Sequence, residues 1–323
     1  MKNLLLLFLA FGCSNPKVTK KDIKLNKQAK MIFGELPKSL IDRDKEAAKI
    51  SLGKKLYFEK RLSINNTISC NSCHKLDQYG VDNEVTSLGH DGTRGERNSP
   101  TVYNAALNFR QFWDGRAKDL AEQAIGPILN PIEHGLASEK DAMEKINSKE
   151  YIALFQKAFP NEKEPFTYKN VGVAIGTFEK TLITDSRFDD YLAGNINALN
   201  EQERRGLQKY VKNGCTSCHG GIGLGGTMYQ KIGLMKKYKT KDLGLYQVTK
   251  KRRDKYKFKV PGLRNVTKTA PYLHDGSVAS LEKTIEIMFE YQLGKEASKE
   301  DIEDIKAFLE SLEAKSLVKV SSN

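Results

Sequence analysis

Four of the five cysteines in this 323-residue chain fall into two patterns of the same form, each with a histidine directly after the second cysteine. The patterns are Cys70-Asn71-Ser72-Cys73-His74 and Cys215-Thr216-Ser217-Cys218-His219. Two thiols at this spacing can each bond a vinyl group of haem, and the adjacent imidazole can ligate the iron. A zinc site would need further Cys or His ligands at suitable spacing, and a redox Cys-x-x-Cys motif needs no histidine. The sequence therefore predicts two covalent c-type haems, one at each motif.

The second face of each iron offers a further ligand position. The remaining histidines are His90, His134 and His274, and several methionines follow the second motif. A Met ligand would raise the potential of the second haem, whereas a His ligand or an open face would keep the first haem low in potential or reactive. His90 is a candidate by spacing but also suits a surface loop, and Met288 equally suits core packing. Residue types alone leave both assignments open.

Helical periodicity dominates the segments that must position these motifs. Val171, Ala174, Ile175, Phe178 and Leu182 form one apolar stripe, and Ser298 with Asp301 begins another helix near the end of the chain. With 39% hydrophobic and 29% charged residues, the composition excludes a polytopic membrane protein and a disordered chain. The prediction is an all-α fold of two tandem cytochrome c-like helical domains, residues 41–184 and 185–323, each with one covalent haem.

Residues 1–13 have the pattern of an export signal, because Lys2 precedes a short apolar run at 4–11. Gly12 stands directly before Cys13, as at a bacterial lipoprotein processing site, so Cys13 is the predicted lipidation site; an ordinary cleaved signal is the alternative. Residues 14–40 open with a lysine-rich stretch and are expected to form a solvated tether. We therefore expect a periplasmic protein whose only membrane attachment is a lipid anchor.

Three further stretches resemble the bacterial dihaem cytochrome c peroxidases. They run from Asn98 to Arg116, from Glu122 to Pro127 and from Thr269 to Gly276, and the resemblance extends from about residue 54 to residue 312. It implies an enzyme that reduces hydrogen peroxide with electrons from a small donor protein, a cytochrome c or a cupredoxin. It also implies a homodimer.

The resemblance assigns a role to particular residues of this chain. The N-terminal haem would be the peroxidatic centre, with His90 as its removable distal ligand, and the C-terminal haem would accept electrons, with Met288 as its axial ligand. Trp113 matches the residue that lies between the haems as an electron conduit. Gln123 and Glu133 match the polar pair of the peroxide pocket, where a carboxylate can move the proton that heterolytic O–O cleavage requires.

A calcium ion between the domains is also implied by the resemblance. Asn98, Thr269 and Pro271 match its ligands, the last two through backbone carbonyls, and oxygen ligands suit Ca²⁺. One residue departs from the family pattern: His134 follows Glu133 where Met is usual. We expect His134 to point elsewhere; the alternative is a titrating group in the pocket.

Charge is concentrated between residues 236 and 259, which hold eleven basic and two acidic residues. A solvated loop is one interpretation, and a docking face for an acidic electron donor is the other. Nucleic acid is not an expected partner, because no binding motif is present. Two other functions compete with the peroxidase: an oxidase of the type that matures tryptophan tryptophylquinone, which has Tyr where this chain has Met288, and a dihaem electron carrier without enzymatic activity.

Overall fold

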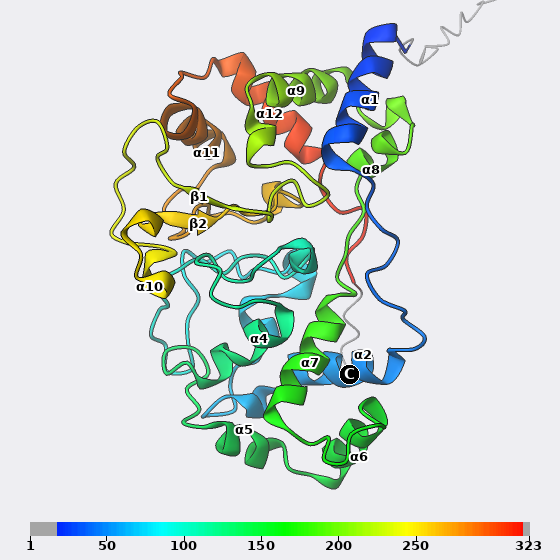
Figure 1. Ribbon diagram of the computed structural model, residues 1–323, viewed down its shortest axis with the longest axis vertical. Coiled ribbons are helices and arrows are strands. Elements are labelled where there is room, and N and C mark those ends of the chain that lie inside the picture. Colours follow the sequence, from blue (N-terminus) through cyan, green and yellow to red (C-terminus); the bar gives the residue numbers. More distant parts are fainter. Residues whose placement is uncertain (1–17, 319–323) are drawn as a thin grey trace, which may run out of the picture.

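The computed structural model describes residues 18–318, so the leader and Cys13 lie outside the described residues. The chain is mainly helical and forms two halves along the long axis of the molecule (Figure 1). The first half holds α2 (Ala47–Tyr57), α3 (Cys70–Cys73), α4 (Leu120–Ile125), α5 (Glu139–Ile146), α6 (Lys149–Ala158) and α7 (Tyr168–Glu179). The second holds α1 (Lys20–Phe33), α8 (Arg187–Leu192), α9 (Glu201–Lys212), α10 (Tyr246–Thr249), α11 (Leu281–Ile287), α12 (Lys299–Glu310), β1 (Tyr229–Lys231) and β2 (Lys257–Lys259).

Each half has its own hydrophobic core. The first core draws its buried residues from positions 52–182, and the second from positions 188–312 together with Ala29 and Phe33. The expected stripe on α7 faces the first core, and the expected capping box of Ser298 and Asp301 begins α12 in the second. The all-α prediction is therefore confirmed.

A close crossing of two helices organises each half, and a glycine permits it. A Cβ on Gly53 of α2 would lie 1.9 Å from the carbonyl oxygen of Ala174 on α7, and a Cβ on Gly206 of α9 would lie 1.8 Å from that of Asp304 on α12. Any side chain at either position would force the helices apart. The two halves thus repeat one packing arrangement, and each places its Cys-x-x-Cys-His motif beside the helix pair.

The structure corrects the expected solvated tether, because residues 20–33 form helix α1. Thr19 and Asp22 form a capping box at its start, and Ala29 and Phe33 are buried in the second core. Asp22 also forms an ion pair with Arg204 at 2.9 Å. The lysines that made the segment look unfolded lie on the exposed side of an amphipathic helix.

Small departures from a purely helical fold lie in the second half. β1 and β2 pair antiparallel, with Tyr229 opposite Lys259, and at three residues each they are too short to leave an alternating pattern in the sequence. After α12 the chain returns to the first half, where the Val318 N–H donates to the Tyr103 hydroxyl at 3.1 Å (Figure 1). Among the described residues, no helix is both long and apolar enough to cross a membrane.

Candidate functional site

The first motif opens onto a cavity of about 700 Å³ in the N-terminal half. Cys70, Cys73 and His74 line it, and neither cysteine forms a disulfide. Cys70 and Cys73 belong to the single turn α3, which is capped by Ser69 and Ser72, and His74 follows directly. This short turn therefore presents both thiols and the imidazole to one space.

The second motif opens onto a cavity of about 500 Å³ in the C-terminal half. Cys215, Cys218 and His219 line it, again without a disulfide. Met288 lines the same cavity and begins a π-helical turn, Met288–Leu293, that follows α11 directly. Such turns are frequent at functional sites.

Both motif histidines suit ligation of a metal. Burial lowers the pKa of His74 and lowers that of His219 to about 4, so both rings are neutral and can offer a nitrogen lone pair. The Nδ1 atoms of both are buried and have no hydrogen-bond partner within residues 18–318. Paired free thiols, a neutral imidazole and a cavity of several hundred Å³ fit a c-type haem in each half.

The two cavities share a wall. Asn98, Ser99, Pro100, Thr101 and Trp113 line both of them. The Trp113 indole N–H donates to the Asn98 carbonyl oxygen at 2.9 Å, and the Lys259 N–H donates to the Trp113 carbonyl oxygen at 2.8 Å. The first bond fixes the indole ring and the second fixes the Trp113 backbone, so Trp113 is held in the wall that the two cavities share.

Glu133 and Gln123 are brought together in the N-terminal cavity. Burial raises the pKa of Glu133, although Arg116 and a hydrogen bond from Asn130 Nδ2 at 2.9 Å oppose the shift. A carboxyl whose pKa is raised toward neutrality is suited to accept and return a proton. The arrangement therefore offers a proton carrier and an amide in the same space as the first motif.

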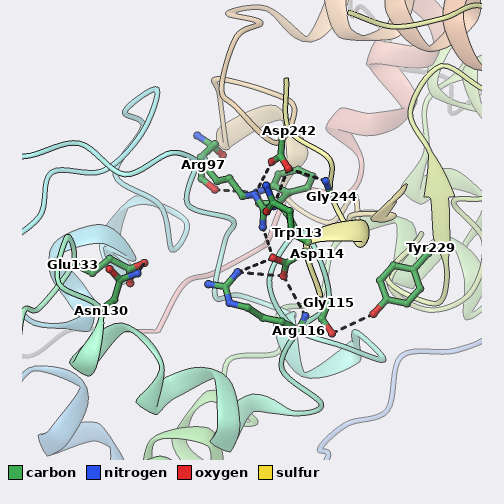
Figure 2. A network of polar contacts seen from close by, with 12 residues as sticks. Arg97, Trp113, Asp114, Gly115, Arg116, Asn130, Glu133, Tyr229, Asp242 and Gly244 are labelled. Atoms are coloured by element: carbon green, nitrogen blue, oxygen red, sulfur yellow. Dashed lines mark hydrogen bonds and ion pairs between the residues drawn. The ribbon is translucent and has the colours of Figure 1, made fainter. Parts of the chain in front are cut away.

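An ion-pair network lies against the shared wall (Figure 2). Arg97 binds Asp114 at 2.6 Å and, through two bonds of 2.7 and 3.0 Å, Asp242 of the C-terminal half. Arg116 binds Asp114 as well and extends toward Glu133. The pKa of Asp242 is lowered, because the bonds from Arg97 outweigh its burial. Sequence reasoning missed this network, since its partners are up to 145 residues apart and carry no motif.

His90 does not line the N-terminal cavity in this conformation. Its ring Nε2 atom lies 3.1 Å from the Pro131 carbonyl oxygen, and its backbone N–H donates to the Glu133 carbonyl oxygen at 2.9 Å. The imidazole thus rests beside the cavity wall that carries Glu133, on a loop whose Gly92 has a φ of +84°.

His134 is buried and bonds away from the proton carrier. Its Nδ1 atom lies 2.7 Å from the Leu62 carbonyl oxygen, and burial lowers its pKa. The residue still borders the N-terminal cavity. The structure therefore engages one ring nitrogen of His134 in a buried structural hydrogen bond.

The three residues matched to calcium all come from the lining of the C-terminal cavity. Asn98, Thr269 and Pro271 all line the C-terminal cavity, and the Asn98 side-chain nitrogen donates to the carbonyl oxygens of Glu84 and Val85. Its amide oxygen is the atom left to bind a cation. Within residues 18–318 no group of three or more His, Cys, Asp or Glu side chains could hold a metal ion.

Comparison with known proteins places the chain in a family. Residues 47–197 match the family model of the di-haem cytochrome c peroxidases. The chain is 43% identical to the cytochrome c551 peroxidase of Pseudomonas aeruginosa, over 90% of this chain and 87% of that protein. It is 46% identical to the cytochrome c peroxidase Ccp of Escherichia coli K12, over 83% of this chain but only 58% of that protein.

A solved structure agrees with the sequence comparisons. The crystal structure of a MauG-like protein associated with microbial copper homeostasis has a TM-score of 0.79 and 29% identity, and the match covers 89% of this chain and 96% of that one. The similarity to dihaem proteins fits the two cavities, each of which contains one Cys-x-x-Cys-His motif. The chain belongs to the bacterial di-haem cytochrome c peroxidase family, whose members are oxidoreductases that act on peroxide.

Proposed function

We propose that this chain reduces hydrogen peroxide to water in its N-terminal cavity, with electrons from a small donor protein that enter at its C-terminal cavity. The observation that carries the proposal is the shared wall: Trp113 borders both cavities, and Glu133 and Gln123 border only the first. Haem bound at each motif supplies the redox chemistry. Residues 41–184 are the peroxidatic unit and residues 185–323 the electron-transfer unit.

Glu133 moves the proton. Heterolytic cleavage requires a proton to pass from one peroxide oxygen to the other, which then leaves as water. Two electrons and two protons complete the conversion of H₂O₂ to two waters. The raised pKa of Glu133 lets its carboxylate accept the first proton and release it again, while the Gln123 amide orients the peroxide.

Trp113 carries electrons between the halves. Its indole is held by the Asn98 carbonyl and its backbone by Lys259, so the ring stays in the wall between the two sites. Met288 supports the C-terminal half as the electron-accepting one, because it lines that cavity and a Met ligand raises the potential of a c-type haem.

Replacing the proton carrier tests the proposal. In Glu133→Gln, kcat/KM for H₂O₂ should fall by roughly 10²–10⁴-fold, while the haem content and both reduction potentials remain those of the wild type. Glu144→Gln is the matched control, because Glu144 is exposed and is not part of the cavity lining. Equal turnover by Glu133→Gln and the wild type would remove Glu133 from the mechanism.

His90 gates the peroxide site. His90 would hold the first haem site closed in the fully oxidised enzyme and would leave it once the protein has taken up one electron. The position of His90 supports this role. Its ring contacts the Pro131 carbonyl oxygen and lies outside the cavity lining. Gly89 and Gly92 flank it on the same loop. Glycines on both sides allow the large backbone change that such a release requires.

The donor docks at the open rim of the C-terminal cavity. Leu234 borders the cavity and is 52% exposed, the adjacent Met235 is 66% exposed, and exposed Lys236, Lys237 and Lys239 follow. An apolar centre with a basic rim suits a small acidic donor, a cytochrome c or a cupredoxin.

The place of Tyr291 disfavours the tryptophylquinone-maturing oxidase. Its ring packs against Tyr238 with centroids 5.2 Å apart, and it is absent from the lining of the C-terminal cavity, which Met288 borders. A pure electron carrier has no use for a buried carboxyl and an amide in one cavity.

The assembly and environment complete the proposal. Asn98, Thr269 and Pro271 bind Ca²⁺ with the help of water, and chelation should lower turnover that Ca²⁺ restores. The mature protein is a periplasmic homodimer anchored by lipid at Cys13. The apolar run before Cys13 supports the anchor.

A further inference from the structure

Lys259 is a buried cation whose ammonium group has no ion-pair partner within residues 18–318. It ends β2, is 5% exposed and lines the C-terminal cavity. Its backbone is held twice, by pairing with Tyr229 of β1 and by the bond to the Trp113 carbonyl oxygen. No carboxylate in residues 18–318 forms an ion pair with its ammonium group, whereas its neighbour Lys257 binds Asp254 at 3.2 Å.

The described lining of the cavity around Lys259 carries positive charge and no carboxylate. Its lining within the described residues includes no Asp or Glu, and its only other Lys or Arg is Arg264. Arg264 is already neutralised by two bonds of 2.8 Å to Asp189. Lys259 is therefore the one cation of this lining that remains free to bind an anion.

Burial of an unpaired ammonium group is costly. Desolvation lowers the pKa of Lys259 to about 8, which still leaves the group mostly charged at neutral pH. Buried charges in proteins are normally paired, and an anion in the cavity would supply the pair and restore the pKa. The cavity that holds this cation also holds the Cys215, Cys218 and His219 cradle for a haem, which carries two propionate carboxylates.

We infer that Lys259 binds a propionate of the C-terminal haem and raises the reduction potential of that haem. This inference rests on the proposed function, because it assigns haem to the C-terminal motif and electron acceptance to that half. A fixed cation favours the addition of an electron nearby. Because the backbone of Lys259 holds Trp113, the same residue joins the electron-accepting site to the wall through which electrons leave.

Redox titration of the mature dihaem protein tests the inference. In Lys259→Met, the equilibrium constant for reduction of the C-terminal haem should fall at least tenfold relative to the other haem, a shift of about 59 mV for one electron. Lys259→Arg should keep the wild-type potential, since it keeps the charge. Lys257→Met is the matched control, because it removes a lysine from the same strand that already has a carboxylate partner.

The two haems are read separately by their visible spectra, and covalent haem content is measured for every variant. If Lys259→Met loses haem, Lys259→Gln replaces it, with the same expectation. An unchanged potential in the uncharged variant, or equal shifts at both haems, would overturn the inference. Peroxide turnover of the wild type is measured in parallel, so that failure of the proposed peroxidase function is recognised independently of the Lys259 result.

Discussion

The imidazole of His90 occupies the space directly above the α-carbon of Gly135. A Cβ at position 135 would lie 2.4 Å from His90 Nε2, and Gly135 has a φ of +77°. The place in which His90 rests outside the cavity therefore exists only because residue 135 has no side chain. If His90 occupies this position when it is released from the N-terminal cavity, a side chain at position 135 must favour the state in which His90 blocks that cavity.

Gly135→Ala should consequently slow peroxide reduction by the one-electron-reduced enzyme at least tenfold, because the methyl group excludes His90 from its resting place. Alanine at a positive φ also costs about 1–2 kcal/mol of stability. Gly194→Ala provides the control, since Gly194 has a φ of +110° and no atom within 4 Å of an added Cβ. Equal losses of activity in the two variants would attribute the effect to backbone strain instead of the gate.

Neutralising the rim of the C-terminal cavity should weaken the donor interaction. With Lys236, Lys237 and Lys239 changed to Gln, kcat/KM for an acidic donor should fall and lose much of its dependence on ionic strength. The measurement is steady-state turnover over a series of salt concentrations. The control changes Lys20, Lys24 and Lys27 to Gln; these lysines are also exposed and lie on α1. A similar loss in both triple variants would mean that only net charge matters.

Glu179 links folding to pH. It lies in α7, lines the N-terminal cavity, and burial alone raises its pKa from 4.5 to about 8. The folded chain then holds this proton up to about pH 8, while the unfolded chain releases it above about 4.5. The stability that Glu179 contributes is therefore present below pH 4.5 and is lost as pH rises through 8.

Glu179→Gln should accordingly gain free energy of unfolding relative to the wild type as pH rises from 5 to 9, by up to roughly 4 kcal/mol. Urea unfolding at several pH values measures the difference. Glu164→Gln, at an exposed position, should show no such trend. A constant difference between wild type and Glu179→Gln across this range would contradict the raised pKa.

His134→Met separates structure from catalysis at the position where this chain departs from its family. The pH–rate profile should stay unchanged, because Nδ1 of His134 is engaged by Leu62 and the ring is held neutral by burial. Stability should fall by about 1–3 kcal/mol, since the buried Leu62 carbonyl loses its partner. A displaced limb of the profile would make His134 part of the pocket's acid–base chemistry.

Local signals explain the parts of the fold that sequence alone predicts. The apolar stripe of α7 and the Ser298–Asp301 capping box of α12 each lie within one helix, and both are confirmed. Helix α1 was missed because its burial depends on distant partners: Phe33 packs against Phe188 at 5.3 Å between ring centroids. Leu25 and Ile32 pack against the same core, but the many lysines of the segment made it look like a solvated stretch in the sequence.

The candidate site also contains some features that the sequence predicts and others that depend on how the two halves pack. The two Cys-x-x-Cys-His motifs are contiguous, so their chemistry is readable directly from the residues. Arg97 and Asp242 meet only because the two halves pack together, and Lys259 is indistinguishable in sequence from the surface lysines around it. The place of His90 depends on the conformation of residues 131–135, which no spacing rule contains.

The most direct measurement is steady-state H₂O₂ reduction with a reduced donor, performed on the fully oxidised and on the one-electron-reduced enzyme after both haems have been counted. We expect little turnover at first from the oxidised form and full turnover from the half-reduced form, because His90 would leave the N-terminal cavity only after the C-terminal half has accepted an electron. Equal turnover in both forms would contradict the gate. Absence of turnover in both, with two haems attached, would contradict the peroxidase itself.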